Sequence, residues 1–270
     1  MRNQLCTEFL QWALPHLGLR WPGFRKVRGQ VCKRIQKRIR ELNLPDPRAY
    51  SAYLEQHPEE WQVLEPLCRV TISRFYRDKG VFDTLNGDVL PHLAETAQQK
   101  GKTVIRIWSA GCASGEEPYT LTLLWNFLLH DRYPDLTLDL VATDIDAALL
   151  ERARRACYPA SALKELPREW RDRGFVHKDN LSQLQPAFQT PVRFVKQDIR
   201  CQTPEGPFDL ILCRNLAFTY YQCELQVQVL RRISDVLAPH GVLVLGTHEV
   251  LPEDVGQWQN RTPEIFEKIK

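Results

Sequence analysis

Five short segments after residue 100 are mainly apolar and have small or polar residues at or next to their ends. They are Val104–Ala110, Asp139–Asp146, Val192–Ile199, Phe208–Asn215 and Gly241–Gly246. Nearly continuous apolar runs of this length are typical of strands that are buried on both faces of a parallel sheet. The stretches between them are long enough for helices. The pattern from Gly101 to the C-terminus therefore predicts alternating strands and helices in an α/β, Rossmann-like domain.

The segment from Arg25 to Arg40 shows a helical pattern instead. Val27, Val31, Ile35 and Ile39 recur every four residues, so they share one face of a helix. The rest of that helix surface carries eight of the 36 Lys and Arg residues of the chain. Such a basic surface is either simply solvated, or it docks an acidic partner whose approach a positive potential accelerates. Both interpretations stay open.

A turn of small residues follows the first predicted strand. Gly111 and Gly115 stand before a helix start, where the lack of a Cβ lets the backbone approach a ligand closely. Glu116 and Glu117 then place two carboxylates where a dinucleotide-binding fold holds pyrophosphate, and like charges repel. This favours an adenosyl ligand with a cationic tail, S-adenosylmethionine, whose ammonium group Glu116 would contact. The glycines also fit a turn that serves packing alone.

Two acidic residues lie at the end of the second predicted strand. Asp144 is placed where a carboxylate can accept hydrogen bonds from both hydroxyls of a ribose. Asp144 and Asp146 also fit the N-cap of a helix from Ala147 to Ala156. Since one acid can bind while the other caps, we assign the ribose to Asp144.

Composition and charge limit the class of protein. The chain has 270 residues, 43% of them hydrophobic, which is enough for a full core. A net charge of +3 is too small to indicate nucleic-acid binding. The eight cysteines form no C-x-x-C pair, which predicts reduced thiols rather than a zinc site or a disulfide framework. No run approaches the roughly 18 apolar residues of a spanning helix, so we expect a cytoplasmic protein.

Four motifs stand in order along the chain. They read FYRD from Phe75 to Asp78, WSAGCASGEEPY from Trp108 to Tyr119, ATDID from Ala142 to Asp146, and LCRN from Leu212 to Asn215. Together they resemble the CheR family of chemotaxis-receptor methyltransferases. The resemblance implies a helical domain over residues 1–80, a linker helix over 81–100 and a catalytic domain over 101–270. It also implies a small antiparallel subdomain at about 164–191.

The resemblance also implies which residues contact the methyl donor. Together with those argued above, they are Thr71, Ser73, Arg77, Gly111, Glu116, Asp144, Asp198, Ile199, Asn215 and Leu216. Arg77 is the family's active-site arginine, and its guanidinium could hold a carboxylate of the donor or of the acceptor, or form an interdomain ion pair. Asp198 would contact the adenine amino group, or cap a turn. Tyr220 is the catalytic candidate on the acceptor side, because Thr219 occupies the position of the family's tyrosine.

The implied reaction is methyl-ester formation on glutamate side chains of receptors, whose methylation helices the basic helix would grasp. A glutamate, with a pKa of about 4.3, is already an anionic nucleophile at neutral pH, so no general base is required. Two alternatives stay open: a CheR-like enzyme that acts on a small molecule or another protein, and an inactive donor-binding sensor or scaffold. We expect no metal, no nucleic acid and no membrane insertion. We also expect no tethering to a receptor tail, because the subdomain lacks the glycine-containing loop that some members use.

Overall fold

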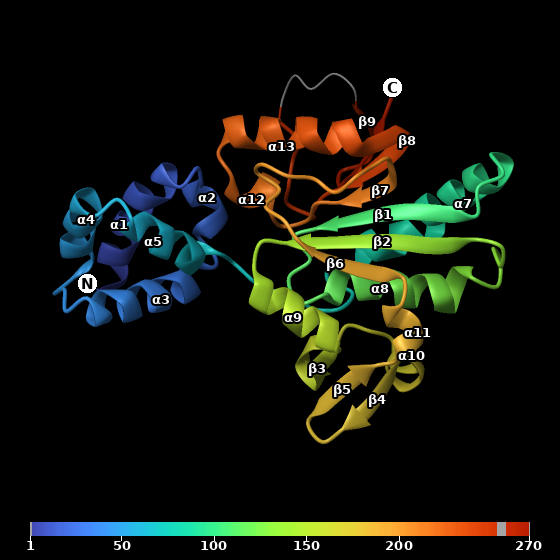
Figure 1. The fold of residues 1–270 in the computed structure, drawn as a ribbon, viewed down its shortest axis with the longest axis horizontal. Helices are drawn as coiled ribbons and strands as arrows, with labels where there is room; N and C mark the ends of the chain where they lie inside the picture. Colours follow the sequence, from blue (N-terminus) through green and yellow to red (C-terminus); the bar gives the residue numbers. More distant parts are fainter. Residues whose placement is uncertain (1, 253–257, 270) are drawn as a thin grey trace. The chain divides into compact units, whose positions relative to one another are not determined.

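The computed structural model describes residues 2–252 and 258–269, and it divides into two compact units (Figure 1). One unit contains the residues up to Thr71 together with Thr219–Gln226. The other contains Ile72–Phe218 and the residues from Val227 onward. The division thus falls at Thr71, whereas the motifs predict a boundary at residue 80. Within the described ranges, no helix has the length and apolar character needed to cross a membrane.

The first unit is helical. Its helices are α1 (Arg2–His16), α2 (Trp21–Phe24), α3 (Arg28–Glu41), α4 (Pro47–Gln56) and α5 (Glu60–Cys68). α4 begins where the Asp46 side chain accepts a hydrogen bond from the Ala49 backbone N–H, which is a side-chain N-cap. A β-bridge between Leu19 and Tyr221 ties the distant segment Thr219–Gln226 to this unit.

α3 confirms the apolar repeat at three of its four positions, since Val31, Ile35 and Ile39 are buried. The helix begins at Arg28 rather than Arg25, so Val27 precedes it and is only partly buried. Its basic side chains, however, do not all lie on a free surface. Arg38 donates hydrogen bonds to both oxygens of the buried Glu60 carboxylate at 2.8 Å, and these bonds lower the pKa of Glu60. The periodicity of the sequence predicts which face of the helix Arg38 lies on. It does not predict that α5 places the Glu60 carboxylate beside Arg38.

A second basic residue of α3 is also engaged inside the helical unit. Arg34 is partly buried and donates to the backbone carbonyl of Arg69. Lys33, Lys37 and Arg40 are the α3 cations whose side chains are exposed. The basic surface predicted over residues 25–40 is therefore smaller than the sequence pattern indicates.

The expectation of reduced thiols throughout is wrong for one pair of cysteines. Cys6 of α1 and Cys32 of α3 form a disulfide, with their Cα atoms 6.0 Å apart. The two residues are 26 positions apart in the chain, on two different helices, and both are buried, so only the folded chain brings them together. The C-x-x-C criterion tests local spacing and cannot detect such a pair.

The second unit is built on one sheet, whose strands lie in the order β6-β2-β1-β7-β8-β10-β9. The strands are β1 (Val104–Ala110), β2 (Thr137–Asp144), β6 (Val192–Lys196), β7 (Phe208–Leu212), β8 (Leu237–Val244), β9 (Trp258–Thr262) and β10 (Ile265–Lys268). The first five are parallel, which confirms the predicted Rossmann-like arrangement. β10 and β9 add an antiparallel hairpin that the pattern does not predict.

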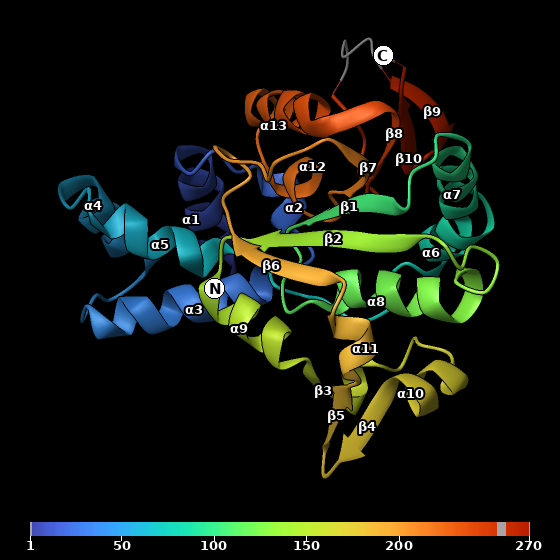
Figure 2. The ribbon, with the colours of Figure 1, turned by 45° about the vertical axis from the view of Figure 1, so that its right-hand side comes forward.

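Helices cover both faces of this sheet. α8 (Glu116–Leu124) and α9 (Ala147–Arg155) lie on one face, and the part of α13 (Cys223–Val236) from residue 227 onward lies on the other (Figures 1 and 2). α6 (Lys79–Thr84) continues through a π-helical turn, Leu85–Val89, into α7 (Leu90–Gln99). This helical stretch occupies the place of the expected linker helix.

A separate three-stranded antiparallel sheet extends from the second unit (Figure 2). It consists of β3 (Cys157–Pro159), β5 (Leu181–Leu184) and β4 (Phe175–Lys178), in that spatial order, with α10 (Arg168–Gly174) and α11 (Pro186–Gln189) beside it in sequence. The sheet begins at Cys157, before the limit of about 164 that the resemblance implies. All predicted donor contacts after residue 110 lie outside it, near the carboxyl ends of the parallel strands.

Candidate active site

The turn after β1 needs its glycines for backbone and packing reasons. Gly111 and Gly115 have φ angles of +74° and +89°, which side chains rarely adopt. A Cβ on Gly111 would lie 2.6 Å from the Leu216 Cδ2 atom, and one on Gly115 would lie 3.1 Å from the Tyr158 hydroxyl. Gly111 and Leu216, both predicted donor contacts, are thus packed against each other.

Of the two acids at the end of β2, Asp146 is the one that caps the following helix. Asp146 is the N-cap of α9, where its side chain accepts hydrogen bonds from the backbone N–H groups of Ala148 and Leu149. Asp144 accepts from the backbone N–H groups of Ala113 and Asp146, both at 2.9 Å. Asp144 therefore joins the end of β2 to the glycine turn, and its predicted contact with ribose stays a prediction.

Glu116 is a buried carboxyl group in the first turn of α8, and only 4% of its surface is exposed. Its Oε2 atom is buried and has no hydrogen-bond partner among the described residues. Burial raises the pKa of Glu116, against the opposing effects of hydrogen bonds from backbone N–H groups and the Ser73 side chain and of the Arg152 charge. Ionised Glu116 is thus a desolvated anion for which the fold supplies too few partners.

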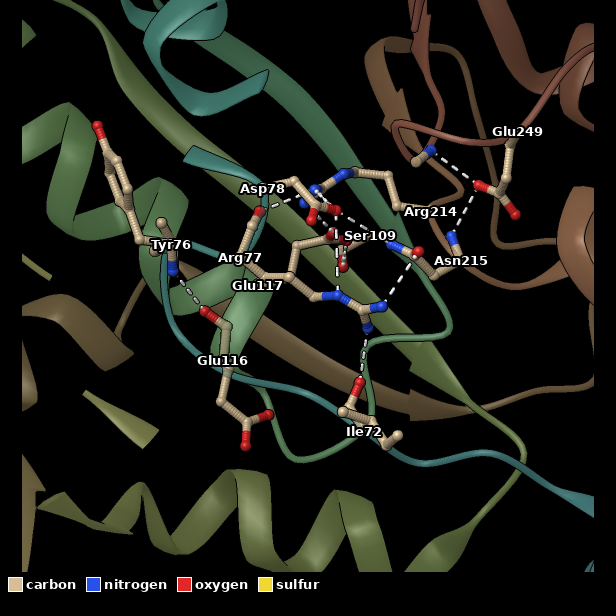
Figure 3. A network of polar contacts seen from close by, with 12 residues as sticks. Ile72, Tyr76, Arg77, Asp78, Ser109, Glu116, Glu117, Arg214, Asn215 and Glu249 are labelled. Atoms are coloured by element: carbon tan, nitrogen blue, oxygen red, sulfur yellow. Dashed lines mark hydrogen bonds and ion pairs between the residues drawn. The ribbon is translucent and has the colours of Figure 1, made fainter. Parts of the chain in front are cut away.

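The next residue, Glu117, is fully paired. Its Oε1 accepts from the Ser109 hydroxyl at 2.7 Å, and its Oε2 accepts from Arg214 at 3.0 Å. The Arg214 side chain is 2% exposed, and it also donates to Asp78 Oδ2 at 2.9 Å and to the Arg77 carbonyl at 2.8 Å (Figure 3). Buried ions of opposite sign thus meet at the ends of β1 and β7.

The Arg77 guanidinium lies beside this cluster but bonds mainly to neutral groups. It donates to the Ile72 carbonyl at 2.7 Å and to Asn215 Oδ1 at 3.1 Å (Figure 3). Its nearest carboxylate is Asp78, at 3.9 Å between Nε and Oδ2, and Arg214 already binds that oxygen. Arg77 is therefore a partly exposed cation that retains capacity to bind an anion.

Asn215 is held by Glu249, a residue that the sequence analysis does not identify. Glu249 is 4% exposed, and its carboxylate accepts from the backbone N–H groups of Asn215, Leu216 and Gly246 at 2.7, 3.1 and 2.7 Å. Asn215 has a φ of +54°, an uncommon conformation that this buried anchor stabilises. No local motif predicts the contact between Glu249 and Asn215. The one feature of the sequence that could have suggested it is an acidic residue shortly after the end of β8.

Asp78, Glu117 and Arg214 were also not predicted as site residues. All lie inside or beside the quoted motifs, so the motifs could have found them. Beside Asp78, an open hollow of about 490 Å³ is lined by Asp78, Lys79, Gly80, Val81, Thr247, His248 and Glu264. The hollow therefore borders the Asp78 end of the network.

The other residues predicted to contact the donor or acceptor are Asp198, Ile199, Thr71 and Tyr220. Asp198 accepts hydrogen bonds from Arg200 on both oxygens and from the Arg200 backbone N–H, so it forms the turn that the sequence allows as an alternative. Ile199 is buried.

Thr71 and Tyr220 belong to the helical unit, where the Tyr220 ring packs against Phe24 at 5.1 Å between centroids. Tyr220 and its neighbour Thr219 lie in a short helix, α12 (Ala217–Tyr220), and not in a strand, where neighbouring side chains would point to opposite faces.

A doubly wound sheet with carboxylates at the ends of β1 and β2 is the arrangement of an α/β domain that binds a nucleoside-containing ligand. The family model described as CheR methyltransferase, SAM binding domain, matches residues 71–265, and the model of the family's all-alpha domain matches residues 26–65. The chain belongs to the CheR methyltransferase family and uses S-adenosylmethionine as methyl donor.

Curated relatives agree with this assignment. A chemotaxis protein methyltransferase of Listeria monocytogenes is 34% identical over 192 residues, which cover 70% of each chain. That of Escherichia coli is 31% identical over 232 residues, covering 82% of this chain and 76% of the relative. The Salmonella typhimurium protein is 30% identical over 247 residues, covering 88% and 82%. These relatives do not favour the alternatives of a small-molecule acceptor or an inactive module.

The two neighbouring glutamates should differ in their effect on stability. The raised pKa of Glu116 means that its ionised form opposes folding. We therefore expect the stability of the wild type, relative to Glu116→Gln, to fall as pH rises from about 4 through the raised pKa. At pH 8 the variant should equal or exceed the wild type in free energy of unfolding, by up to about 2 kcal/mol. Urea unfolding of the full chain from pH 4 to 8 measures this.

Glu117→Gln is the matched control. It breaks a buried ion pair, so it should lower the free energy of unfolding at pH 7 by about 3 kcal/mol. Equal destabilisation by both variants at pH 8 would contradict the assignment of Glu116 as an unsatisfied anion.

Proposed function

We propose that this enzyme methylates glutamate side-chain carboxylates of an acidic protein, of the chemoreceptor type that the names of its relatives indicate. The observation that carries the proposal is the state of Arg77. Its guanidinium has neutral hydrogen-bond partners and is partly exposed, while the nearby Asp78 is bound to Arg214. Such a cation suits the binding of a carboxylate at the place of reaction.

The donor-side residues fit a ligand that carries positive charge. The ion pairs of this network involve Asp78 and Glu117, and Glu116 takes no part in them, so its carboxylate is available to a cation of the donor. We assign Glu116 to the donor's ammonium group and Asp144 to its ribose. The turn at Asp198 and Ile199 would border the adenine, and Asn215 and Leu216 would border the reacting end. Thr71 and Ser73 complete the proposed set, Ser73 through its bond to Glu116.

Bound S-adenosylmethionine supplies a methyl group on a sulfonium and leaves as a thioether. The glutamate carboxylate forms the new O–C bond while the C–S bond breaks in line with it, and no proton has to move. Arg77 aligns the carboxylate of the acceptor or of the donor, and Asn215, fixed by Glu249, limits the space beside it. Such alignment can supply roughly 7 to 11 kcal/mol of the barrier. Tyr220 is the proposed acceptor-side residue of the helical unit.

The proposed linkage can be tested by its sensitivity to base. The enzyme is incubated with methyl-labelled donor and a purified receptor signalling fragment, and the labelled fragment is then treated with alkali. We expect the label to be released as methanol, because a carboxyl methyl ester hydrolyses whereas N-methyl and thioether groups do not. A fragment with its methylatable glutamates changed to glutamine is the control and should stay unlabelled. Base-stable label, or labelling of the control, would reject the glutamate acceptor.

The proposed docking surface for the acidic acceptor is the exposed part of α3. Lys33, Lys37 and Arg40 lie there, whereas Arg34 and Arg38 are bound inside the helical unit. Reversing the three exposed charges to Glu should raise the acceptor KM at least tenfold at low salt, with kcat nearly unchanged, and should weaken the salt dependence of KM. Initial rates at several salt concentrations measure this.

Two further variants separate docking from folding. Lys100→Glu, an exposed charge reversal in the other unit, should leave KM unchanged. Arg38→Glu should lower stability, since it places two carboxylates together at the buried Glu60. If the triple reversal leaves KM and its salt response unchanged, the basic surface is only solvated.

A further inference from the structure

We propose that Arg214 is a positioning residue, which binds the Asp78 carboxylate and thereby keeps the Arg77 guanidinium available for its anion. The inference rests on the proposed function of Arg77 and adds a residue to it. Arg214 itself is too buried to meet an acceptor, because its side chain is 2% exposed. Its influence on the reaction must pass through the groups that it holds.

Those groups come from two parts of the fold. Arg214 bonds to Glu117 in the first turn of α8, to Asp78 immediately before α6, and to the carbonyl of Arg77. Its Cζ lies 5.0 Å from the centroid of the Phe82 ring of α6. The guanidinium therefore joins the segment that carries Arg77 to the ends of β1 and β7.

The segment that carries Arg77 needs such anchors. Tyr76 and Asp78, the residues on either side of Arg77, have φ angles of +55° and +61°. Non-glycine residues in this region carry backbone strain, which persists where the surrounding contacts over-determine the conformation. Arg214 binds the main chain of Arg77, and Asn215, the next residue, binds its side chain at 3.1 Å. Two consecutive residues thus fix both ends of Arg77.

Asp78 is the competitor that Arg214 restrains. Its Oδ2 lies 2.9 Å from the Arg214 guanidinium but 3.9 Å from Arg77 Nε. Without the Arg214 charge, the nearest cation for this carboxylate would be Arg77, and a bidentate pair between neighbours would occupy the anion-binding side of Arg77. A stability role alone does not account for this arrangement, because buried ion pairs add little net stability over apolar residues of similar size.

The test is second-site rescue. Arg77→Ala, Arg214→Gln, Asp78→Asn and the double variant Arg214→Gln/Asp78→Asn are compared for kcat, acceptor KM and the calorimetric Kd of S-adenosylhomocysteine. We expect Arg214→Gln to change the same parameter as Arg77→Ala, by at least tenfold. Removing the competing charge in the double variant should restore that parameter to within about threefold of Asp78→Asn alone.

Further variants keep the result interpretable. Arg214→Lys retains the charge and should lie between the wild type and Arg214→Gln, and it serves if the Gln variant does not fold. Arg132→Gln removes an arginine from an exposed pair with Glu95 and should leave all three parameters unchanged. A double variant no better than Arg214→Gln, or an Arg214→Gln effect on a different parameter from that of Arg77→Ala, overturns the proposal. Failure of wild-type enzyme to form base-labile label would instead reject the proposed function.

Discussion

The site depends on how charges are balanced at the carboxyl edge of the sheet. The buried Arg214 binds the partly buried Glu117 and Asp78, while Arg77 bonds to neutral oxygens beside them. Glu116, next to Glu117 in the chain, keeps a buried oxygen without a partner. The two adjacent glutamates therefore have different roles in the proposed function. Glu117 forms an ion pair with Arg214 within the protein, and Glu116 binds the ammonium group of the donor. Burial makes both roles strong, because unscreened charges interact over longer range.

Local chemistry made part of this site predictable. The apolar runs predicted the five parallel strands, and parallel strands bring their carboxyl ends to one edge, so Gly111, Asp144 and Asn215 could be expected at that edge. The glycine turn was predictable because positive φ angles at Gly111 and Gly115 exclude most side chains. Motif order added the family, although the structure leaves the individual contacts with the donor as proposals.

Contacts between distant residues could not be predicted in this way. Cys6 and Cys32 form a disulfide between two helices, and Arg38 binds Glu60 of another helix. Glu249 binds the backbone of Asn215, which is 34 residues away in the chain. Hydrophobic periodicity predicts which face of a helix or strand is buried, but it does not predict which other element packs against that face. Local spacing did contain one further signal, since Asp198 stands two residues before Arg200, which binds it. The hairpin of β9 and β10 was missed because its strands are short and mostly polar, with only two buried apolar residues, Ile265 and Phe266.

The most direct test of the account compares two ligands that differ in one group. S-adenosylhomocysteine and its desamino analogue, in which hydrogen replaces the amino group, are titrated calorimetrically into the wild type, Glu116→Gln and Glu117→Gln. The account predicts that the wild type prefers S-adenosylhomocysteine by about tenfold to a hundredfold, the range of a hydrogen bond between charged groups. Glu116→Gln should lose most of this preference and Glu117→Gln should keep it. An unchanged preference in Glu116→Gln would contradict the account.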